Sequence, residues 1–300
     1  MYVVIGATGN TGEVVADKLL AAGVKVRVIG RDAKKLQRFT QKGAEAFVAD
    51  VTNAASTEEA FSGATAVFAM VPPDLSAPDI LAHYRRVGDS IVAGIKKSGI
   101  KYAVVLSSIG ADKPDRTGPV QGLHHIEELI GTIPGLNALF LRPGYFMENL
   151  LPQVGVIHSF GIMGGPVLSD LAVSMIATRD IGVVAAEALL KLNFNGKSTR
   201  ELHGARDITF AECAKIIGPA IGKPDLAYMQ LPPSQLKPAL VKMGMSSSMA
   251  DGLLELAEAL NSGHMKMLEP RSPANTTPTT LETFVADTFV PAYRGKAAGA

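Results

Sequence analysis

The sequence predicts an α/β protein in which a doubly wound parallel sheet carries a smaller, mostly helical C-terminal region. Three features favour this fold class. Short apolar runs alternate with amphipathic stretches through the first half, a glycine-rich turn follows the first apolar run, and the alternation stops near residue 153. We expect one domain over 1–153 and a smaller substrate-binding region over 154–291, interleaved with the first. We expect a frayed tail over 292–300.

The strands and helices of the first half follow from apolar spacing and turn residues. Strands are expected at 2–5, 24–30, 44–50, 64–71, 101–108 and 136–144. Helices are expected at 11–23, 32–43, 56–63, 78–99 and 122–131. Asp32 should cap the second helix, and Ser56 and Glu59 have capping-box spacing for the third. Because such alternation requires parallel pairing with helices on both faces, the first half is predicted to be a Rossmann-type sheet.

The second half has a different pattern. Residues 154–170 are rich in glycine, and the stretch SFGIMGGPVL at 159–168 could form a flexible lid or a plain hairpin. Helices are expected at 179–192, 207–223, 235–244 and 248–263, with a strand at 199–204. A Pro/Thr-rich segment leads to a last helix at 279–289, where Thr279 and Glu282 have capping-box spacing.

Charge and composition exclude several classes of function. The net charge of +1 argues against a nucleic-acid partner. The single cysteine, Cys213, excludes a disulfide framework and a cysteine-based metal cluster, and its apolar neighbours predict a buried side chain. The sequence contains no apolar run of about 18 residues, so no membrane span is predicted. No signal peptide is recognised, so we expect a cytoplasmic protein without membrane partners.

The first loop, GATGNTG, joins the first strand to the first helix. Its glycines let the backbone turn and let a phosphate approach, while the helix N-terminus supplies N–H groups and the positive end of its dipole. The position in the first strand–turn–helix unit favours a dinucleotide site over a plain turn. The residues predicted to surround the pyrophosphate are Gly6, Thr8, Gly9, Asn10, Thr11 and Gly12.

The end of the second strand predicts which nucleotide binds. An acidic residue there would read a ribose 2′-OH, but Gly30 stands in that place and Arg31 follows it. A guanidinium, with Lys35 one turn further on, suits a 2′-phosphate. Asp32 could read a 2′-OH, but we assign it to helix capping. NADP(H) is therefore expected in preference to NAD(H), with a solvated surface arginine as the alternative interpretation of Arg31.

Ligands of such sheets lie outside the carboxyl ends of the strands. Asp50 and Val51 are therefore expected beside the adenine, although Asp50 could instead cap a helix. The other strand ends contribute Met70, Pro72, Ser107, Pro143, Tyr145 and Phe146. Tyr145 and Phe146 could stack on a flat ring or simply pack in the core.

Four segments together resemble the NmrA-like group of atypical short-chain dehydrogenases/reductases. They are GATGNTG at 6–12, RDAKKL at 31–36, LSSIGAD at 106–112 and LRPGYFMENLL at 141–151. Within that group the chain is most similar to bacterial NAD(P)H:quinone-oxidoreductase-type members. The resemblance implies a Rossmann domain with a small substrate region, and a nicotinamide near the ends of the fifth and sixth strands. It also implies either a reductase or a cofactor-sensing regulator that catalyses nothing.

The sequence departs from ordinary short-chain dehydrogenases, whose Tyr-x-x-x-Lys pair lets a phenolate exchange a proton. No tyrosine here has a lysine four residues on; Tyr145, for example, is followed by Asn149. His124 and His125 stand near the place where some relatives carry a catalytic lysine. Either could donate a proton or simply lie on a helix surface. His125 and Tyr145 are the candidate catalytic residues.

The favoured hypothesis is an NADPH-dependent reductase of quinones or similar flat acceptors that uses direct hydride transfer, without flavin or metal. The missing tyrosine–lysine pair argues strongly against alcohol dehydrogenation. It argues only weakly against quinone reduction, since water can protonate the product oxygens. The alternative is a non-catalytic redox-sensing regulator that binds NAD(P) and acts through a protein partner.

Overall fold

The computed structural model describes residues 1–297, and a seven-stranded parallel sheet lies at its centre. The strands are β1 Tyr2–Ile5, β2 Val26–Gly30, β3 Glu45–Val48, β4 Ala66–Ala69, β5 Tyr102–Leu106, β6 Asn137–Pro143 and β10 Lys197–Leu202. Their order is β10-β6-β5-β4-β1-β2-β3, and Val4 of β1 lies opposite Val28 of β2 and Phe68 of β4. The chain therefore builds outward in both directions from β1 and β4, which confirms the doubly wound Rossmann-type sheet.

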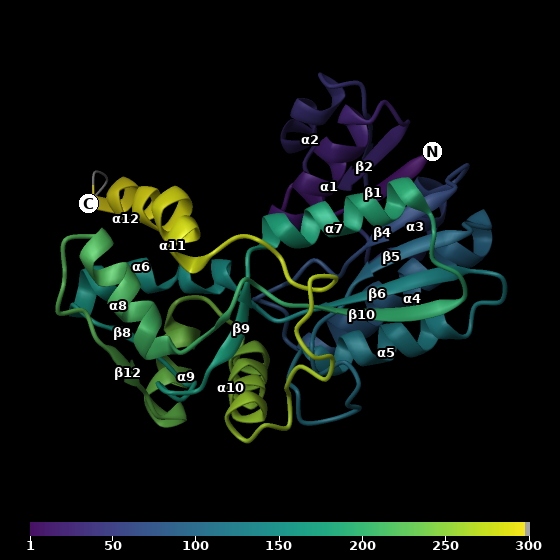
Figure 1. Cartoon of the computed structure of the whole chain (residues 1–300). Helices are drawn as coiled ribbons and strands as arrows, with labels where there is room; N and C mark the ends of the chain where they lie inside the picture. Colours follow the sequence, from purple (N-terminus) through teal and green to yellow (C-terminus); the bar gives the residue numbers. More distant parts are fainter. Residues whose placement is uncertain (298–300) are drawn as a thin grey trace.

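Helices cover both faces of this sheet (Figure 1). One face carries α1 Asn10–Ala21, α2 Ala33–Thr40 and α7 Thr178–Lys191; the other carries α3 Ala54–Phe61, α4 Ile80–Ser98 and α5 Val120–Gly131. On α4, the apolar residues Val87, Ile91 and Ile95 recur at helical spacing and pack against the sheet. A parallel strand that is buried on both faces consists of nearly continuous apolar residues. For this reason the strands of the sheet could be recognised in the sequence.

Two elements from beyond residue 153 complete this layered unit. β10 pairs with β6 from Lys197 opposite Ala138 to Leu202 opposite Pro143, and α7 packs against α1. The predicted strand at 199–204 is therefore present, displaced by two residues. The division of the chain into two interleaved parts at residue 153 stays a prediction, although β10 and α7 come from beyond that residue.

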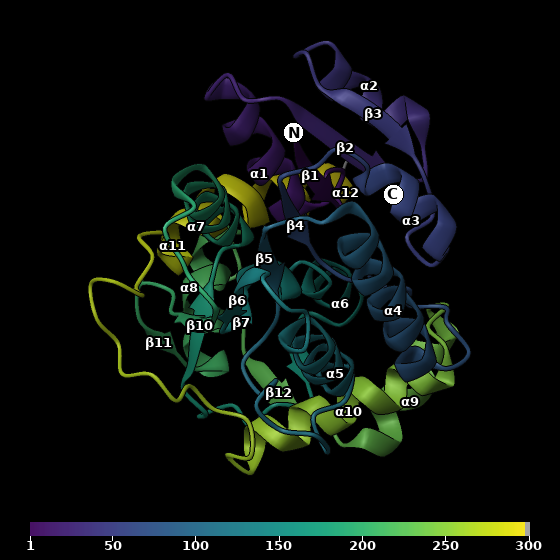
Figure 2. The same cartoon turned by 90° about the vertical axis from the view of Figure 1, so that its right-hand side faces the viewer.

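The remaining elements form a smaller, mostly helical cluster to one side of the sheet (Figures 1 and 2). Its helices are a 3-10 turn Met147–Leu150, α6 Gln153–Phe160, α8 Phe210–Ala220, α9 Pro233–Lys242, α10 Ser247–Asn261, α11 Leu281–Phe284, a π-helical turn Val285–Phe289 and α12 Val290–Ala297. Its strands are β7 Tyr145–Phe146, β8 Met163–Gly165, β9 Val173–Ile176, β11 Asp207–Ile208 and β12 Tyr228–Gln230. They pair as β11-β9-β7 and β12-β8.

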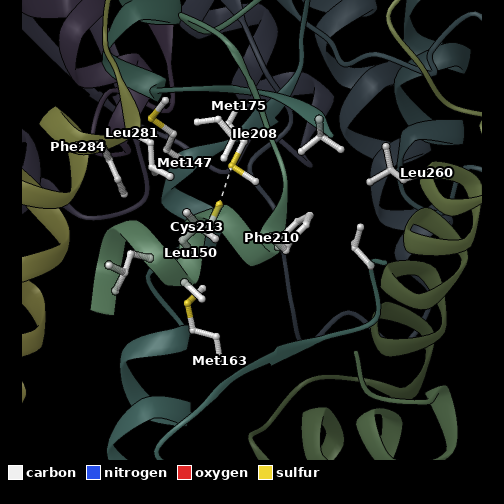
Figure 3. Close-up of a cluster of buried hydrophobic side chains, with 14 of the residues drawn as sticks. Met147, Leu150, Met163, Met175, Ile208, Phe210, Cys213, Leu260, Leu281 and Phe284 are labelled. Atoms are coloured by element: carbon white, nitrogen blue, oxygen red, sulfur yellow. Dashed lines mark hydrogen bonds between the residues drawn. The ribbon is translucent and has the colours of Figure 1, made fainter. Parts of the chain in front are cut away.

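Cys213 lies in the apolar core of this cluster, as predicted (Figure 3). Its Sγ is 3.6 Å from Sδ of Met175, and the side chain is fully buried. Burial raises the pKa of the Cys213 thiol to about 12, so the thiol stays protonated and packs as a small apolar group.

Two predicted capping boxes were wrong because another side chain, one local and one distant in the sequence, takes part in the contact. The third helix begins at Ala54, since Asn53 Oδ1 accepts the backbone N–H of Ser56 and takes the capping role. The last helical segment is capped by Thr280 rather than Thr279, whose hydroxyl donates instead to Asp180 at 2.8 Å. Both predicted capping boxes are thus displaced by a neighbouring side chain.

Longer-range pairing also corrects three segments. The helix expected from residue 207 begins at Phe210, because 207–208 pair with β9, and Thr209 and Glu212 form the capping box. The glycine-rich segment contains α6 and β8 rather than a plain hairpin. The tail expected to fray is helical through Ala297, where the His158 ring stacks on Tyr293; residues 298–300 lie outside the described part.

No helix within residues 1–297 combines the length and the apolar character that a bilayer crossing requires.

The first turn of α1 lies unusually close to the loop before it. Gly6 has a φ of +69°, a conformation that favours glycine, and Gly9 N–H donates to the Gly6 carbonyl oxygen at 2.9 Å. A Cβ atom added to Gly12 would lie 2.2 Å from that same oxygen. The absence of a side chain at Gly12 therefore sets how closely α1 can approach β1.

Gly12→Ala should destabilise the protein by about 1–3 kcal/mol, because backbone atoms must shift to admit the methyl group. Gly155→Ala is the matched control, since Gly155 lies in α6 and a Cβ there meets nothing within 4 Å. The control should be neutral or stabilising by up to about 1 kcal/mol. Urea denaturation measures both, and equal stabilities for the two variants would contradict the close packing of α1.

Candidate functional site

The loop between β1 and α1 leaves backbone donors open at a helix N-terminus. Gly9 is the N-cap of α1, and no side chain caps the first turn. Thr8, Gly9 and Asn10 are exposed, whereas Thr11 is buried beneath them. The unsatisfied N–H groups and the positive end of the helix dipole suit a phosphate group.

A cavity of about 280 Å³ opens beside this loop. Gly6 and Thr8 line it from the loop, Arg31 from the end of β2, and Asp50 and Val51 from the end of β3. The hydrogen bond from the backbone N–H of Thr52, at 2.9 Å, is the main reason that the pKa of Asp50 is lowered, and Arg31 lowers it further. The Asp50 carboxylate can therefore accept hydrogen bonds from a ligand.

Two side chains of α4 that were not predicted from the sequence, His83 and Arg86, also line this cavity. They are three residues apart and so share one helix face, which is the signal that could have identified them. Nε2 of His83 lies 2.9 Å from the carbonyl oxygen of Pro72, which also lines the cavity. Arg31 and Arg86 give this small cavity two guanidinium groups.

The two residues that follow Arg31 on α2 have different positions. Asp32 caps α2, with its Oδ1 accepting the Lys34 backbone N–H at 2.8 Å, so its assignment to capping is confirmed. Lys35 is exposed and does not line either cavity. Of the basic residues predicted to face a 2′-phosphate, only Arg31 reaches the cavity wall.

A larger cavity of about 600 Å³ lies beyond the ends of β4, β5 and β7. Met70, Ser107, Tyr145 and Phe146, all predicted site residues, line it. An apolar stripe of α10 also lines it and was not predicted, although its helical spacing is visible in the sequence: Met249, Leu253, Leu256 and Leu260. The cavity thus has predominantly apolar walls, as small-molecule sites commonly do.

Tyr145 joins this cavity to the core of the smaller cluster. Its ring packs edge-on against Phe210 of α8, with 5.4 Å between ring centroids. Burial raises the pKa of the Tyr145 phenol well above its usual value. The hydroxyl therefore stays protonated at neutral pH, and Tyr145 can donate a hydrogen bond but cannot act as a phenolate base.

A buried ion pair stands behind the larger cavity and was not predicted. Arg142 of β6 donates to both carboxylate oxygens of Glu127 on α5, at 3.0 Å from Nε and 2.5 Å from Nη2. Burial lowers the pKa of Arg142, but the hydrogen bonds and charge of Glu127 outweigh this and raise it. The hydroxyl of Ser107 completes the group, 2.5 Å from Oε1 of Glu127.

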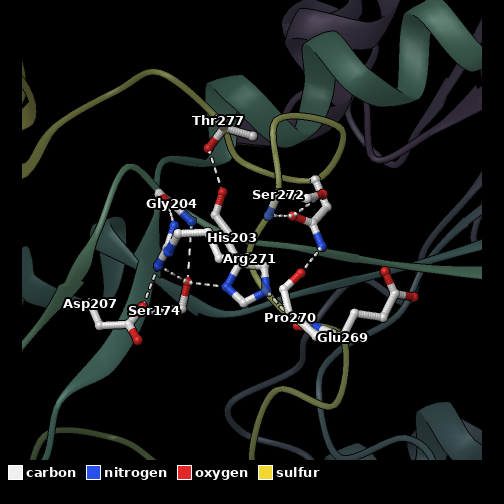
Figure 4. Close-up of polar contacts among 10 residues, drawn as sticks. Ser174, His203, Gly204, Asp207, Glu269, Pro270, Arg271, Ser272 and Thr277 are labelled. Atoms are coloured by element: carbon white, nitrogen blue, oxygen red, sulfur yellow. Dashed lines mark hydrogen bonds and ion pairs between the residues drawn. The ribbon is translucent and has the colours of Figure 1, made fainter.

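A second polar group lies at the edge of the larger cavity where β9 and β11 meet (Figure 4). Ser174 and Asp207 line the cavity, and Oγ of Ser174 lies 3.3 Å from Nδ1 of the buried His203. Nε2 of His203 is 3.0 Å from the carbonyl oxygen of Glu269. Arg271 bonds to Asp207, so these side chains are already paired with one another.

The two candidate histidines of α5 do not reach the larger cavity, which Val120 and Leu123 of the same helix line instead. His125 lies 3.9 Å from Asp89 of α4, and Nδ1 of His124 is 2.8 Å from the Ala111 carbonyl oxygen. His125 lies two residues, about 200° around the helix, from Leu123 and so faces away from the cavity. His124 shares a helix face with Val120, but its ring bonds to the Ala111 carbonyl oxygen.

The predicted cofactor residues fall into three groups. Those lining the smaller cavity are Gly6, Thr8, Arg31, Asp50, Val51 and Pro72. Those lining the larger cavity are Met70, Ser107, Tyr145 and Phe146. Those lining neither are Gly9, Asn10, Thr11, Gly12, Lys35 and Pro143, of which the first four form the loop and the first turn of α1. Pro143 is buried at the end of β6.

The chain is similar to known proteins over most of its length. The model of the NmrA-like family matches residues 2–285. The NAD(P)H azoreductase of Xenophilus azovorans is 30% identical over 260 residues, which cover 85% of this chain and 86% of that protein.

Two solved structures share the fold over nearly the whole chain. An NADPH-dependent quinone oxidoreductase from Escherichia coli, complexed with NADPH, has a TM-score of 0.73 at 21% identity and covers 96% of this chain and 100% of its own. The triphenylmethane reductase of a Citrobacter species, complexed with NADP(H), has a TM-score of 0.77 at 20% identity, with the same coverage of 96% and 100%.

Proposed function

The chain belongs to the NmrA-like family and is an NAD(P)H-dependent oxidoreductase, and we propose that it uses NADPH to reduce quinones or similarly flat acceptors by direct hydride transfer. One observation carries the proposal: the two cavities adjoin, with Pro73 lining both of them along the carboxyl ends of the strands. A dinucleotide laid across those ends would have its adenosine in the smaller cavity and its nicotinamide at the larger one.

The residues around the smaller cavity fit the cofactor. The open amides of α1 would hold the pyrophosphate, and a side chain at Gly6 or Gly12 would obstruct the loop, since an added Cβ would lie 2.4 Å from Met70 Sδ or 2.2 Å from the Gly6 oxygen. Arg31 and Arg86 supply two cations for a 2′-phosphate. This charge supports a preference for NADPH over NADH.

The larger cavity fits a flat, apolar acceptor. Its α10 wall carries aliphatic and thioether side chains, while Tyr145 and Phe146 present aromatic rings on another side. When bound, NADPH supplies the hydride. The cavity walls would hold the acceptor against the nicotinamide and exclude water, and the neutral Tyr145 phenol would donate a hydrogen bond to an oxygen that gains negative charge.

The direct test is NADPH oxidation, followed by the loss of reduced-nicotinamide absorbance, with a panel of benzoquinones, naphthoquinones and azo dyes. We expect turnover above the enzyme-free rate with at least one acceptor, since hydride transfer between positioned rings needs no further group. A rate equal to the enzyme-free control for every acceptor would contradict the proposal and favour a non-catalytic sensor.

Arg31→Ala should weaken NADPH binding by about 10- to 100-fold, because one charge-assisted hydrogen bond to the 2′-phosphate is lost. NADH binding should change little, since NADH has no 2′-phosphate. Titration calorimetry measures both affinities.

Lys25→Ala is the matched control for Arg31→Ala. Lys25 is exposed just before β2, at the opposite end of the strand from Arg31, so its loss removes the same charge away from the cavity. The control should keep both affinities. An equal loss of NADPH and NADH affinity in Arg31→Ala would contradict the assignment of Arg31 to the 2′-phosphate.

A further inference from the structure

Ser107 is held by a charged pair at the wall of the larger cavity. It follows β5, lines the cavity and is only 3% exposed. Its Oγ lies 2.5 Å from Oε1 of Glu127, whose carboxylate also receives two hydrogen bonds from Arg142. The three residues come from the ends of two adjacent strands and from the helix between them.

The chemistry of the pair determines the direction of the Ser107 hydrogen bond. A guanidinium only donates, and the carboxylate paired with it only accepts. The Ser107 hydroxyl must therefore donate its proton to Glu127. The backbone N–H of Ser107 is also used, since it donates to the Leu141 carbonyl oxygen at 2.8 Å. Ser107 can thus offer only oxygen lone pairs to a ligand.

We propose that Ser107 is a fixed hydrogen-bond acceptor that selects an N–H or O–H donor on the ligand in the larger cavity, and that Glu127 is the positioning residue that sets this polarity. The inference rests on the proposed function for the identity of the ligands. The donor could be the carboxamide NH2 of the nicotinamide or a donor group of the reducible substrate, because both would enter the same cavity.

This polarity has a consequence for the chemistry. With its proton committed to Glu127, Ser107 does not stabilise a developing oxyanion, which would need a donor. A ligand without a donor leaves the Ser107 oxygen buried and unpaired, which costs about tenfold in affinity or more. The cavity should therefore discriminate between ligands that differ only in one N–H group.

The first arm of the test compares NADPH with its acetylpyridine analogue, in which a methyl group replaces the carboxamide NH2. Direct fluorescence titration of the full chain should give about tenfold tighter binding of NADPH. In Ser107→Ala this ratio should fall towards one. Ser108→Ala is the control, because Ser108 also lines the cavity but is not bonded to Glu127, and it should keep the wild-type ratio.

The second arm compares the KM of naphthoquinone with that of its amino derivative, again in wild type and Ser107→Ala. If Ser107→Ala abolishes the affinity ratio of the first arm, the nicotinamide carboxamide is the donor. If it abolishes the KM ratio of the second arm, the donor is on the substrate. Ratios unchanged by Ser107→Ala in both arms would overturn the proposal.

Glu127→Ala separates the positioning role from a structural one. In the wild type Oε1 of Glu127 accepts from Ser107 and both carboxylate oxygens accept from Arg142; alanine removes this acceptor and frees the Ser107 hydroxyl, so the preference for donor-bearing ligands should shrink although no ligand-contacting atom changes. Thermal melting reports any loss of stability separately from this ratio. An unchanged ratio in folded Glu127→Ala would refute the role of Glu127, whereas wild-type protein that binds no NADPH would refute the proposed function itself.

Discussion

The contact between the first turn of α1 and the Gly6 carbonyl is the constraint on which both cavities depend. Because Gly12 has no side chain, α1 begins directly against the carboxyl end of β1, where an added Cβ would lie 2.2 Å from the Gly6 oxygen. The same loop is packed on its other side by Met70, whose sulfur would lie 2.4 Å from a Cβ on Gly6. Gly6 lines the smaller cavity and Met70 the larger one, so a single backbone turn forms part of both walls.

The two cavities differ in their lining: charged side chains line the smaller one, and mainly apolar side chains line the larger one. Arg31, Arg86 and Asp50 surround the smaller cavity, where a phosphate-bearing ligand would need them. The larger cavity is mainly apolar. Asp207 at its wall is paired with Arg271, and the pair of Glu127 and Arg142 behind Ser107 is satisfied internally. A buried pair of this kind adds little net stability compared with apolar packing. In our proposal the pair instead serves ligand selection, because it fixes the direction of the Ser107 hydrogen bond.

Most of the sheet and the glycine loop could be predicted from the sequence, because buried parallel strands leave continuous apolar runs and the loop needs glycine at fixed positions. The capping boxes at Ser56 and Thr279 failed where Asn53 and Asp180 offered competing partners. Glu127 and Arg142 could not be paired in advance, since their contact depends on how α5 packs beside β6. The faces of α4 and α10 that line the cavities carry visible helical spacing, but only the fold shows where each face points.

Direct hydride transfer from NADPH to an acceptor in the adjoining cavity is the central claim. It is tested most directly with NADPH deuterated at one or the other of the two C4 positions, followed by mass spectrometry of the NADP+ formed. A nicotinamide held in one orientation should lose deuterium from only one of the two labelled forms, and that form should turn over more slowly. Equal loss of deuterium from both forms would contradict transfer within a structured site.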